Sequence, residues 1–381
     1  MSFLSSRPAM RWVVPGAAAT AVLGGGIAIG TLATAAEPSL PPRTAAQLLV
    51  DLQTARLDGL SGTVAQRADL GLPDVAKLVG AGGSDLASLI SGKNTLRVWY
   101  AGPDKARVAL MGTLGETDVI RNGTDAWVWS SKTKEATHVK VPADSFGASG
   151  AAPSAVPGLP STPQEAADMA LQAIDPSTAV TVDRTARVAG RDAYQLVLKP
   201  RDTASLVGRV TVAIDSTEHV PLRFQILPKG SADPAFEAAF TQISFARPDA
   251  DQFAFNPPPG TKITDKPAPA ATEKPKIAKP EGDKSKIDKG TAADEPKRVG
   301  TGWTTVLVSS APADATAPAP GQGEGAAQAQ SLLNQLPKVS GSWGSGRLLS
   351  GKLFSVLLND DGRVLGGLVS PERLYEVAAQ R

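Results

Sequence analysis

The chain has 381 residues, with 39 basic and 37 acidic side chains, a formal net charge of +2 and no cysteine. A chain of this length has room for two domains. The near balance of charge gives no strong field to hold nucleic acid or to attract an acidic substrate. The lack of cysteine excludes disulfides, thiolate metal sites, cysteine nucleophiles and lipid attachment through an N-terminal cysteine.

The N-terminal segment has the pattern of an export signal. Residues 12–36 carry no charge, Arg7 and Arg11 precede them, and small residues at 33–36 fit a cleavage site. The uncharged stretch is also long enough to span a bilayer. The sequence therefore predicts a signal peptide or an N-terminal membrane anchor over residues 1–36. The remainder is expected outside the cytoplasm, in the periplasm or at the outer face of the cytoplasmic membrane.

The first domain is expected to be mainly β. Residues 44–57 have apolar side chains near helical spacing, with Thr44 as the N-cap. Residues 60–70 then alternate between apolar and polar, and segments within 96–141 and 180–255 do the same between short turns. This pattern predicts one antiparallel sheet of about ten strands.

A helix is predicted between the two blocks of strands. Thr162, Pro163 and Glu165 provide an N-cap, a proline at the first helical position and a capping-box acid. Met169 and Ile174 belong to the apolar stripe of this helix. It is placed to cover the sheet.

The last part of the first domain carries two features, a predicted bulge and a proline run that ends the domain. A change of alternation between Phe240 and Ile243 predicts a β-bulge that bends the sheet. Three prolines at 257–259 cannot donate hydrogen bonds to a strand ladder. We therefore place the first domain at residues 37–260.

The next segment is predicted to be a solvated linker over residues 261–299. Residues 261–298 contain ten basic residues, seven acidic residues, five prolines and no aromatic residue. Such a composition buries too little apolar surface to offset the conformational entropy of folding.

A small α+β C-terminal domain is predicted at residues 300–381. Its expected elements are strands at 303–308, 353–358 and 364–369, helices at 326–336 and after Ser370, a hairpin turn at 359–362 and a mobile glycine-rich loop at 341–346.

The sequence shows no catalytic set of side chains. Ser131 and Lys134 match S-x-x-K, but they lie in a predicted turn without the partner motifs of serine acyltransferases. His138 and His219 are the only histidines, and neither belongs to a spaced ligand set. The sequence predicts a non-enzymatic protein with no catalytic residue, no metal and no cofactor.

The apolar face of the sheet is the candidate binding surface. It is either an ordinary packed core or the lining of a ligand cavity. On the strand with Trp127 and Trp129 both faces carry apolar groups, so its inner side stays open. Strand alternation gives these candidate lining residues: Val98, Tyr100, Val108, Leu110, Leu196, Val212, Ile214, Phe224 and Ile226, with Met169 and Ile174 on a lid.

Four segments carry a resemblance to known proteins: residues 60–63, 102–107, 122–129 and 253–260. In their order and spacing they resemble the LolA family of lipoprotein carriers and the related N-terminal domain of RseB/MucB regulators. The resemblance implies a curved, half-open antiparallel β-barrel with a helical lid over a cavity that holds acyl chains.

Two functions follow as hypotheses from this resemblance. The first is an exported binding protein of the cell envelope that holds a lipid or lipoprotein acyl chain in an apolar cavity. The alternative is an RseB/MucB-like regulator that binds a membrane-bound anti-sigma factor in envelope stress signalling. The linker and the second domain favour the alternative, and neither function involves nucleic acid.

Overall fold

The protein is described by a computed structural model that covers residues 39–72, 89, 92–112, 115–141, 176–266, 296–310 and 335–380. The predicted signal or anchor, the helix with Met169 and Ile174, and nearly all of the helix at 326–336 lie outside these residues. Over the ranges just given, no helix is long and apolar enough to cross a membrane.

The larger of two sheets has twelve strands, in the order β12-β6-β5-β4-β3-β2-β1-β11-β10-β9-β8-β7. Its first strands are β1 (Leu60–Ala68), β2 (Gly92–Tyr100), β3 (Lys105–Met111), β4 (Glu116–Asn122), β5 (Asp125–Ser130) and β6 (Glu135–Lys140). They are followed by β7 (Thr178–Val188), β8 (Arg191–Pro200), β9 (Val207–Asp215), β10 (Pro221–Pro228), β11 (Phe236–Ser244), the 3-10 helix η4 (Ala250–Phe253) and β12 (Lys262–Lys266).

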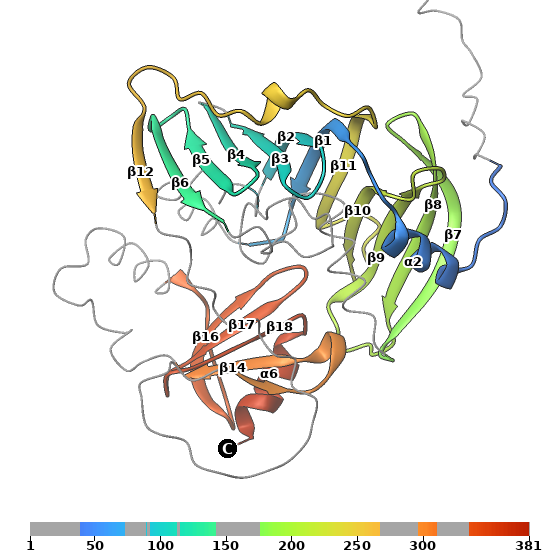
Figure 1. Cartoon of the computed structure of the whole chain (residues 1–381). Helices are drawn as coiled ribbons and strands as arrows, with labels where there is room; N and C mark the ends of the chain where they lie inside the picture. The colour runs from blue at the N-terminus through green and yellow to red at the C-terminus, as the bar shows by residue number, and fades with distance from the viewer. Residues whose placement is uncertain are drawn as a thin grey trace, which may run out of the picture. The chain divides into compact units, whose positions relative to one another are not determined.

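The strand order joins two antiparallel meanders side by side. Strands β1 to β6 are successive neighbours, as are β7 to β11, and the two runs meet where β1 pairs with β11 (Figure 1). Strands β7 and β12 form the two edges, so the sheet is open. A twisted sheet of more than about ten strands curls rather than staying flat. The predicted fold class, mainly β with an open antiparallel sheet, is confirmed, with twelve strands in place of about ten.

The predicted bulge lies where the two meanders meet. Thr63 of β1 is opposite Gln242 of β11, but Val64 is opposite Phe240, so Thr241 is the extra residue. The Thr241 hydroxyl donates to the Thr63 carbonyl at 3.2 Å. Because a bulge increases local twist and bends its strand, this residue contributes to the curl of the sheet.

Helix α2 (Ala45–Thr54) begins at the predicted N-cap. The Thr44 hydroxyl accepts the Gln47 amide at 3.2 Å, and the Gln47 side chain accepts the Thr44 amide at 2.9 Å. This reciprocal pair satisfies two backbone donors that a helix start leaves open.

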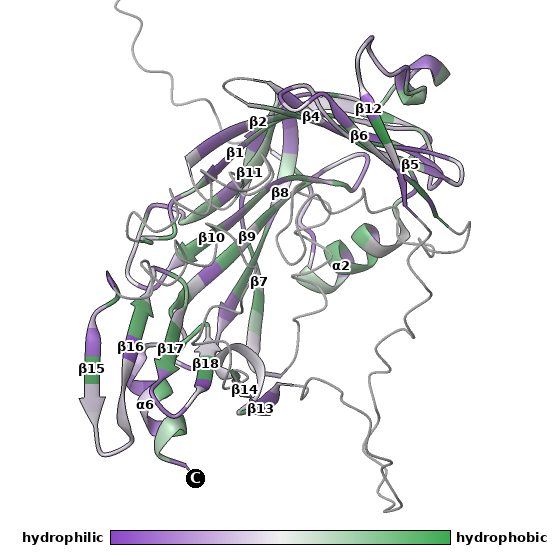
Figure 2. Cartoon of the chain, turned by 90° about the vertical axis from the view of Figure 1, so that its left-hand side faces the viewer, coloured by the Kyte–Doolittle hydropathy of each residue, from purple (hydrophilic) through white to green (hydrophobic). Residues whose placement is uncertain are grey.

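Helix α2 packs against one face of the large sheet. Leu48 and Leu52 of the helix are buried in the same apolar cluster as Val64 of β1 and Leu96 of β2. We call the face under α2 the inner face and the opposite one the outer face. In Figure 2 the strands show apolar residues alternating with hydrophilic ones, which is the pattern of a sheet with one buried face.

The segment between β11 and β12, residues 245–261, runs across the outer face, and we call it the outer-face strap (Figure 1). Helix η4 within it packs against β3 and β4 and buries Phe253 to 1% exposure. The Phe255 ring lies 4.9 Å from that of Trp127 and 6.4 Å from that of Trp129. Both tryptophans therefore belong to the outer face, which settles the assignment that the sequence left open.

Strand β12 shows that the predicted linker starts too early. Residues 262–266 pair in parallel with β6, with Lys262 opposite Glu135 and Lys266 opposite Val139. All five residues of β12 are exposed, and Ile263 is the only large apolar one. The composition of this segment therefore does not predict a strand. Short, charged strands of this kind are nevertheless typical of sheet edges.

The smaller sheet has six strands, in the order β13-β14-β18-β17-β16-β15. Its elements are β13 (Lys297–Val299), η5 (Gly302–Thr304), β14 (Val306–Ser310), β15 (Lys338–Gly341), β16 (Gly344–Ser350), β17 (Ser355–Asn359), β18 (Arg363–Gly367) and helix α6 (Pro371–Ala379). Val306, Leu357, Leu365 and Leu374 are fully buried in its core.

Two expectations for this part of the chain have different outcomes. The hairpin turn at 359–362 is confirmed, because β17 and β18 pair in antiparallel order around it. The glycine-rich stretch at 341–346 was expected to be a mobile loop, but it forms the turn and paired ends of the β15–β16 hairpin. Gly344 has φ +118°, a conformation that other residues rarely adopt. The tight turn of this hairpin therefore explains a glycine at this position.

The loop between β16 and β17 inserts into the core of the larger sheet. Leu353 is buried in the apolar cluster that contains Leu48 and Val64. Beside it, the Lys352 amide donates to the Leu70 carbonyl at 2.7 Å. The two sheets therefore share part of one apolar core.

Candidate functional site

The nine predicted lining residues all lie on the inner face. The β-ladder places Val98 opposite Val108, and Leu196 opposite Val212, which is opposite Phe224. Seven of the nine are buried in one cluster: Val98, Val108, Leu110, Leu196, Val212, Ile214 and Phe224. Ile226 is partly buried against that cluster and Tyr100 is half-buried. Burial, followed by the nearby Asp104 carboxylate, raises the pKa of Tyr100.

One row of valines shows how the inner face changes across the sheet. Val98, Val108, Val119 and Val128 are successive partners on β2, β3, β4 and β5. The first two are almost fully buried, Val119 is half-buried, and Val128 is 40% exposed. The apolar surface thus continues from the packed core to a partly open end. Val119 and Val128 could not be assigned to this face from the sequence, because the apolar residues on both sides of β5 hid its inner side.

Helix α2 and the chain before it close the opposite end of the inner face. Besides the packing of Leu48 and Leu52, the hydroxyl of buried Tyr194 donates to the Pro41 carbonyl at 2.9 Å. Arg43 forms an ion pair with Asp51 at 3.0 Å. In the part of the chain that the structure describes, α2 therefore acts as the cover of this face, while the predicted lid residues Met169 and Ile174 stay predictions.

Two residues of the suspected S-x-x-K motif have structural roles. The Ser131 hydroxyl accepts the Glu116 backbone amide at 2.7 Å, which ties the β5–β6 turn to the start of β4. Lys134 lies in the same turn with φ 54°. This arrangement explains the serine without a catalytic role.

His138 has an environment that the sequence did not predict. Its Nε2 lies 2.7 Å from the Asp125 carboxylate and its Nδ1 lies 2.8 Å from that of Asp265. The imidazole stacks on Trp127, with ring centroids 4.1 Å apart. Asp265, followed by Asp125, raises the pKa of His138, although burial opposes the shift. The Lys140 ammonium and then His138 lower the pKa of Asp125.

This cluster, His138 with its two carboxylates, holds strands together rather than a metal ion. The two carboxylates bind opposite nitrogens of one ring, so the three side chains do not converge on a common point. Over the described ranges, no group of three such side chains is arranged to hold a metal. The signal was hidden because Asp265 comes from the stretch that composition assigned to a linker.

A second charged group fixes the turn between β9 and β10. Arg191 donates to the Asp215 carboxylate through Nη2 at 2.9 Å and also through Nε. The same carboxylate accepts the amides of Thr217 and Glu218 at 2.9 and 2.8 Å. Burial works to raise the pKa of Asp215, but Arg191 and the two amides outweigh it and the pKa is lowered. These contacts stabilise a turn and leave no free group for chemistry.

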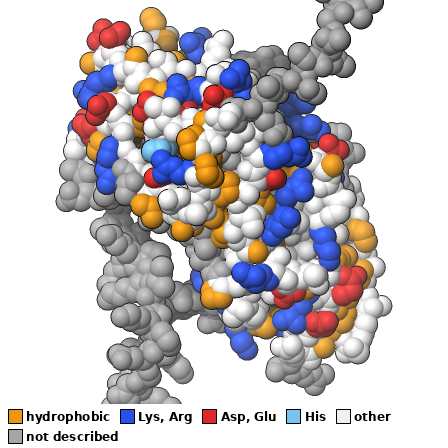
Figure 3. Space-filling model, turned by 90° about the vertical axis from the view of Figure 1, so that its right-hand side faces the viewer, with side chains coloured by type: hydrophobic (Ala, Val, Ile, Leu, Met, Phe, Trp, Pro, Cys, Tyr) orange, Lys and Arg blue, Asp and Glu red, His pale blue; other side chains and the backbone are white. Residues whose placement is uncertain are grey.

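The charged surface is mixed. On the side of the molecule shown in Figure 3, lysine and arginine side chains form a band, and acidic side chains lie on both sides of it. Such a distribution agrees with the net charge of +2. On this side no single charge dominates, and the inner face remains the strongest candidate site.

No protein-family model matches this chain. No curated protein matches it either. Among solved structures, the complex of MucA and MucB from Pseudomonas aeruginosa is similar with a TM-score of 0.41 and 15% identity, over 88% of this chain and 96% of that one. A LolA superfamily protein from Nitrosomonas europaea is similar with a TM-score of 0.23 and 11% identity, over 56% of this chain and 99% of that one.

An uncharacterized conserved protein from Thermus thermophilus is similar as well, with a TM-score of 0.34 and 12% identity, over 58% of this chain and 99% of that one. The two groups that the sequence resembles, LolA and MucB, are thus found again among these structures. Likenesses of this size carry no information about function, which has to be argued from the inner face itself.

Proposed function

We propose that the protein is an exported, non-enzymatic binding protein of the cell envelope, and that its inner face holds the acyl chain of a lipid or lipoprotein. The observation that supports this most is the valine row from buried Val98 to Val128, which is 40% exposed. An apolar surface that leaves the packed core and reaches solvent is typical of a binding site for an apolar ligand.

The chemistry of the inner face suits a hydrocarbon chain. Its candidate lining residues are aliphatic or aromatic, and burying apolar area stabilises a complex by roughly 25 cal/mol per Å². Helix α2 covers this face through Leu48 and Leu52. An acyl chain that enters the buried part of this face has to displace Leu48 and Leu52, so we expect α2 to move when the ligand binds.

The first test looks for the ligand directly. Protein purified from its own envelope is extracted with organic solvent and the extract is analysed by mass spectrometry, and the delipidated protein is titrated with a fluorescent fatty acid. We expect a co-purifying lipid and saturable binding of the fatty acid. Absence of both would reject the proposal.

A matched pair of variants locates the site. Val128→Asp places a charge at the open end of the inner face, where Val128 is 40% exposed. Met111→Asp makes the same change on the outer face, where Met111 is 39% exposed. A charge against an acyl chain pays a large desolvation penalty, so Val128→Asp should weaken fatty-acid binding about tenfold or more. Equal effects of the two changes would exclude the inner face.

A second candidate function is regulation through a membrane-bound anti-sigma factor. It is favoured by the smaller sheet, where Leu307 of β14 and Leu368 just after β18 are 45% and 38% exposed. Exposed apolar side chains of this kind mark protein contact surfaces when they cluster. Leu307→Asp leaves the shared core at Leu353 intact, so it is a milder test than deletion of residues 301–381. If an anti-sigma factor from the same genome binds the Leu307→Asp protein as well as the unchanged one, this surface is not its site.

A further inference from the structure

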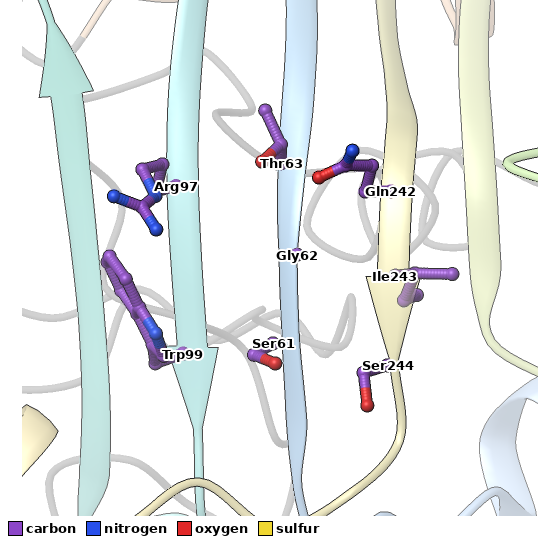
Figure 4. Close-up of a pocket in the computed structure, with 8 residues that line it drawn as sticks. All are labelled: Ser61, Gly62, Thr63, Arg97, Trp99, Gln242, Ile243 and Ser244. Carbon is purple, nitrogen blue, oxygen red and sulfur yellow. The ribbon is translucent and has the colours of Figure 1, made fainter. Parts of the chain in front are cut away.

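The outer face carries a groove that acyl-chain binding does not use. It has a volume of about 250 Å³ and lies over β1, between β2 and β11 (Figure 4). The groove is lined by Ser61, Gly62, Thr63, Arg97, Trp99, Gln242, Ile243 and Ser244. Since Trp99 is the neighbour of inner-face Val98 on the same strand, the two candidate sites lie on opposite faces.

The groove owes its shape to small residues and to the bulge. In Figure 4, Arg97 and Trp99 stand on β2 at one side and Gln242 stands on β11 at the other, with the short side chain of Ser61 between them on β1. The extra residue of the bulge, Thr241, directly precedes Gln242. Bulges occur next to functional sites because they redirect side chains, and this one forms a wall of the groove.

Arg97 provides a positive charge at the groove. Its guanidinium lies over the Trp99 ring, 5.2 Å from the centroid. It forms no ion pair with any carboxylate of the residues that the structure describes. Arg107 also lies 5.2 Å from the same ring, but it is paired with Asp118 at 2.8 Å and with Glu116 at 3.7 Å. Arg97 also interacts electrostatically with the Glu116 carboxylate, but the ion pair of Glu116 is with Arg107. Of the two arginines, Arg97 is therefore the one that can take an anion from a ligand.

Neutral polar groups surround this cation. In the described part of the chain the hydroxyls of Ser61 and Thr63 and the amide of Gln242 have no hydrogen-bond partner. Ser244 accepts only the Ala246 amide, at 3.3 Å. These side chains can donate and accept toward a ligand with several oxygen atoms.

The volume and lining together narrow the ligand class. A groove of about 250 Å³ is just below the range of roughly 300–1,000 Å³ for drug-sized ligands, so it fits one ring rather than a polymer segment. Its hydroxyls, amide and guanidinium disfavour a hydrocarbon chain. A guanidinium that is held by an aromatic ring and forms no ion pair with the described carboxylates, together with several hydroxyl-binding groups, suits a sugar with a carboxylate.

We propose that this groove binds a single acidic sugar residue. Its carboxylate contacts Arg97, which Trp99 positions through the contact between its ring and the guanidinium, and its hydroxyls bond to Ser61, Thr63 and Gln242. This site works independently of the acyl-chain site, so either can fail without the other.

The test uses the full chain, labelled with nitrogen-15, and glucuronate as the probe, with glucose as its neutral counterpart. We expect glucuronate to shift the Trp99 indole signal and the backbone amides of Ser61, Gly62 and Thr63 in a saturable way at millimolar concentration. The dissociation constant of glucose should be higher by about tenfold or more, because a charge-assisted hydrogen bond is lost. Equal binding of both sugars would overturn the role of Arg97.

Variants separate the groove from general charge attraction. Arg97→Gln and Trp99→Leu should each raise the dissociation constant about tenfold or more. Arg67→Gln is the matched control, because Arg67 is an exposed arginine of β1 on the same face but outside the groove. If Arg67→Gln weakens binding as much as Arg97→Gln does, the attraction is not specific and the proposal fails. Arg97→Lys keeps the charge but loses the planar fork of the guanidinium. Its dissociation constant should therefore lie between that of the unchanged protein and that of Arg97→Gln.

A further probe tests the sugar assignment. N-acetylglutamate carries a carboxylate on a chain without ring hydroxyls. If it shifts the groove signals while glucuronate does not, the groove binds an acidic amino acid and the sugar proposal is wrong. Spectra that stay unchanged up to the solubility limit of glucuronate would also reject the sugar proposal.

Discussion

The Nδ1 atom of His138 lies 2.8 Å from a carboxylate oxygen of Asp265, and this contact fastens the edge strand β12 to β6. Because Nε2 lies 2.7 Å from Asp125, both ring nitrogens face acceptors. Both can donate only when the ring is protonated. The protonated imidazole of His138 on β6 is thus the form that can donate both to Asp125 on β5 and to Asp265 on β12.

We expect β12 to loosen as the pH rises. The pKa of His138 is raised above its ordinary value of 6.5, so its contribution to docking is complete below 6.5 and is lost as the pH rises through the raised value. The pKa of Asp125 is lowered from 3.8, so its contribution is lost only in stronger acid, as the pH falls through the lowered value. Hydrogen-exchange protection factors of residues 262–266 should therefore decrease on the alkaline side.

Asp265→Asn tests whether this clamp causes the pH dependence. Removing the carboxylate should move the pKa of His138 back toward its ordinary value and shift the loosening to lower pH. The matched control is His219→Asn, since His219 lies in a turn with φ 58° that asparagine tolerates. Loosening at the same pH in Asp265→Asn and in the unchanged protein would contradict the prediction.

Arg107→Gln should destabilise the large sheet strongly. Asp118 has a side-chain exposure of 3% and its carboxylate lies 2.8 Å from the Arg107 guanidinium. Loss of the cation leaves a buried carboxylate without its partner, which costs about 3 kcal/mol or more of the free energy of unfolding. Urea unfolding measures the change.

Asp118→Asn is the comparison for this pair. It removes the buried charge together with the ion pair, so its cost should be smaller, about 1–2 kcal/mol. Adding Asp118→Asn to Arg107→Gln should recover part of the lost stability, because the unpaired charge is gone. Strict additivity of the two changes would show that the pair does not interact.

Gly62→Ala should also destabilise the protein. A Cβ atom at Gly62 would lie 2.5 Å from the Gln242 carbonyl oxygen and 2.9 Å from the Phe240 ring. The backbone oxygen cannot rotate away, so the sheet must shift at a cost of about 1–3 kcal/mol. Ser61→Ala in the same strand is the control and should stay within about 0.5 kcal/mol.

Phe253→Ala tests the outer-face strap. The ring is 1% exposed under η4, which packs against β3 and β4. Loss of a buried phenylalanine ring costs about 3–5 kcal/mol. If the strap contributes little to the fold, thermal unfolding of the variant will match that of the unchanged protein, and the prediction is wrong.

Local patterns in the sequence predict most of the fold. Alternation identified the inner-face strands, the N-cap at Thr44 identified the start of α2, and the parity change near Ile243 identified the bulge. These features depend on neighbours close in the chain. Strand β12 could not be predicted, because its pairing partner β6 is far away in the sequence. The contact between Lys262 and Glu135 joins positions 127 residues apart.

The candidate sites differ in the same way. The inner face could be predicted because strand alternation alone defines it. The open end at Val128 could not, because Trp127 and Trp129 are covered only when Phe255 of the strap folds across them. The Arg97 groove depends on three strands meeting side by side and on the pairing of Glu116 with Arg107 rather than with Arg97, which no local pattern reveals.

The pairing of β1 with β11 also has a kinetic consequence. The hydrogen bond from Thr241 to Thr63 joins positions 178 residues apart, so loop closure has to precede this contact. Until β11 is in place, the edge of β1 stays unpaired, and an open strand edge invites aggregation. Late docking of β11 therefore makes this edge the vulnerable point of the folding chain.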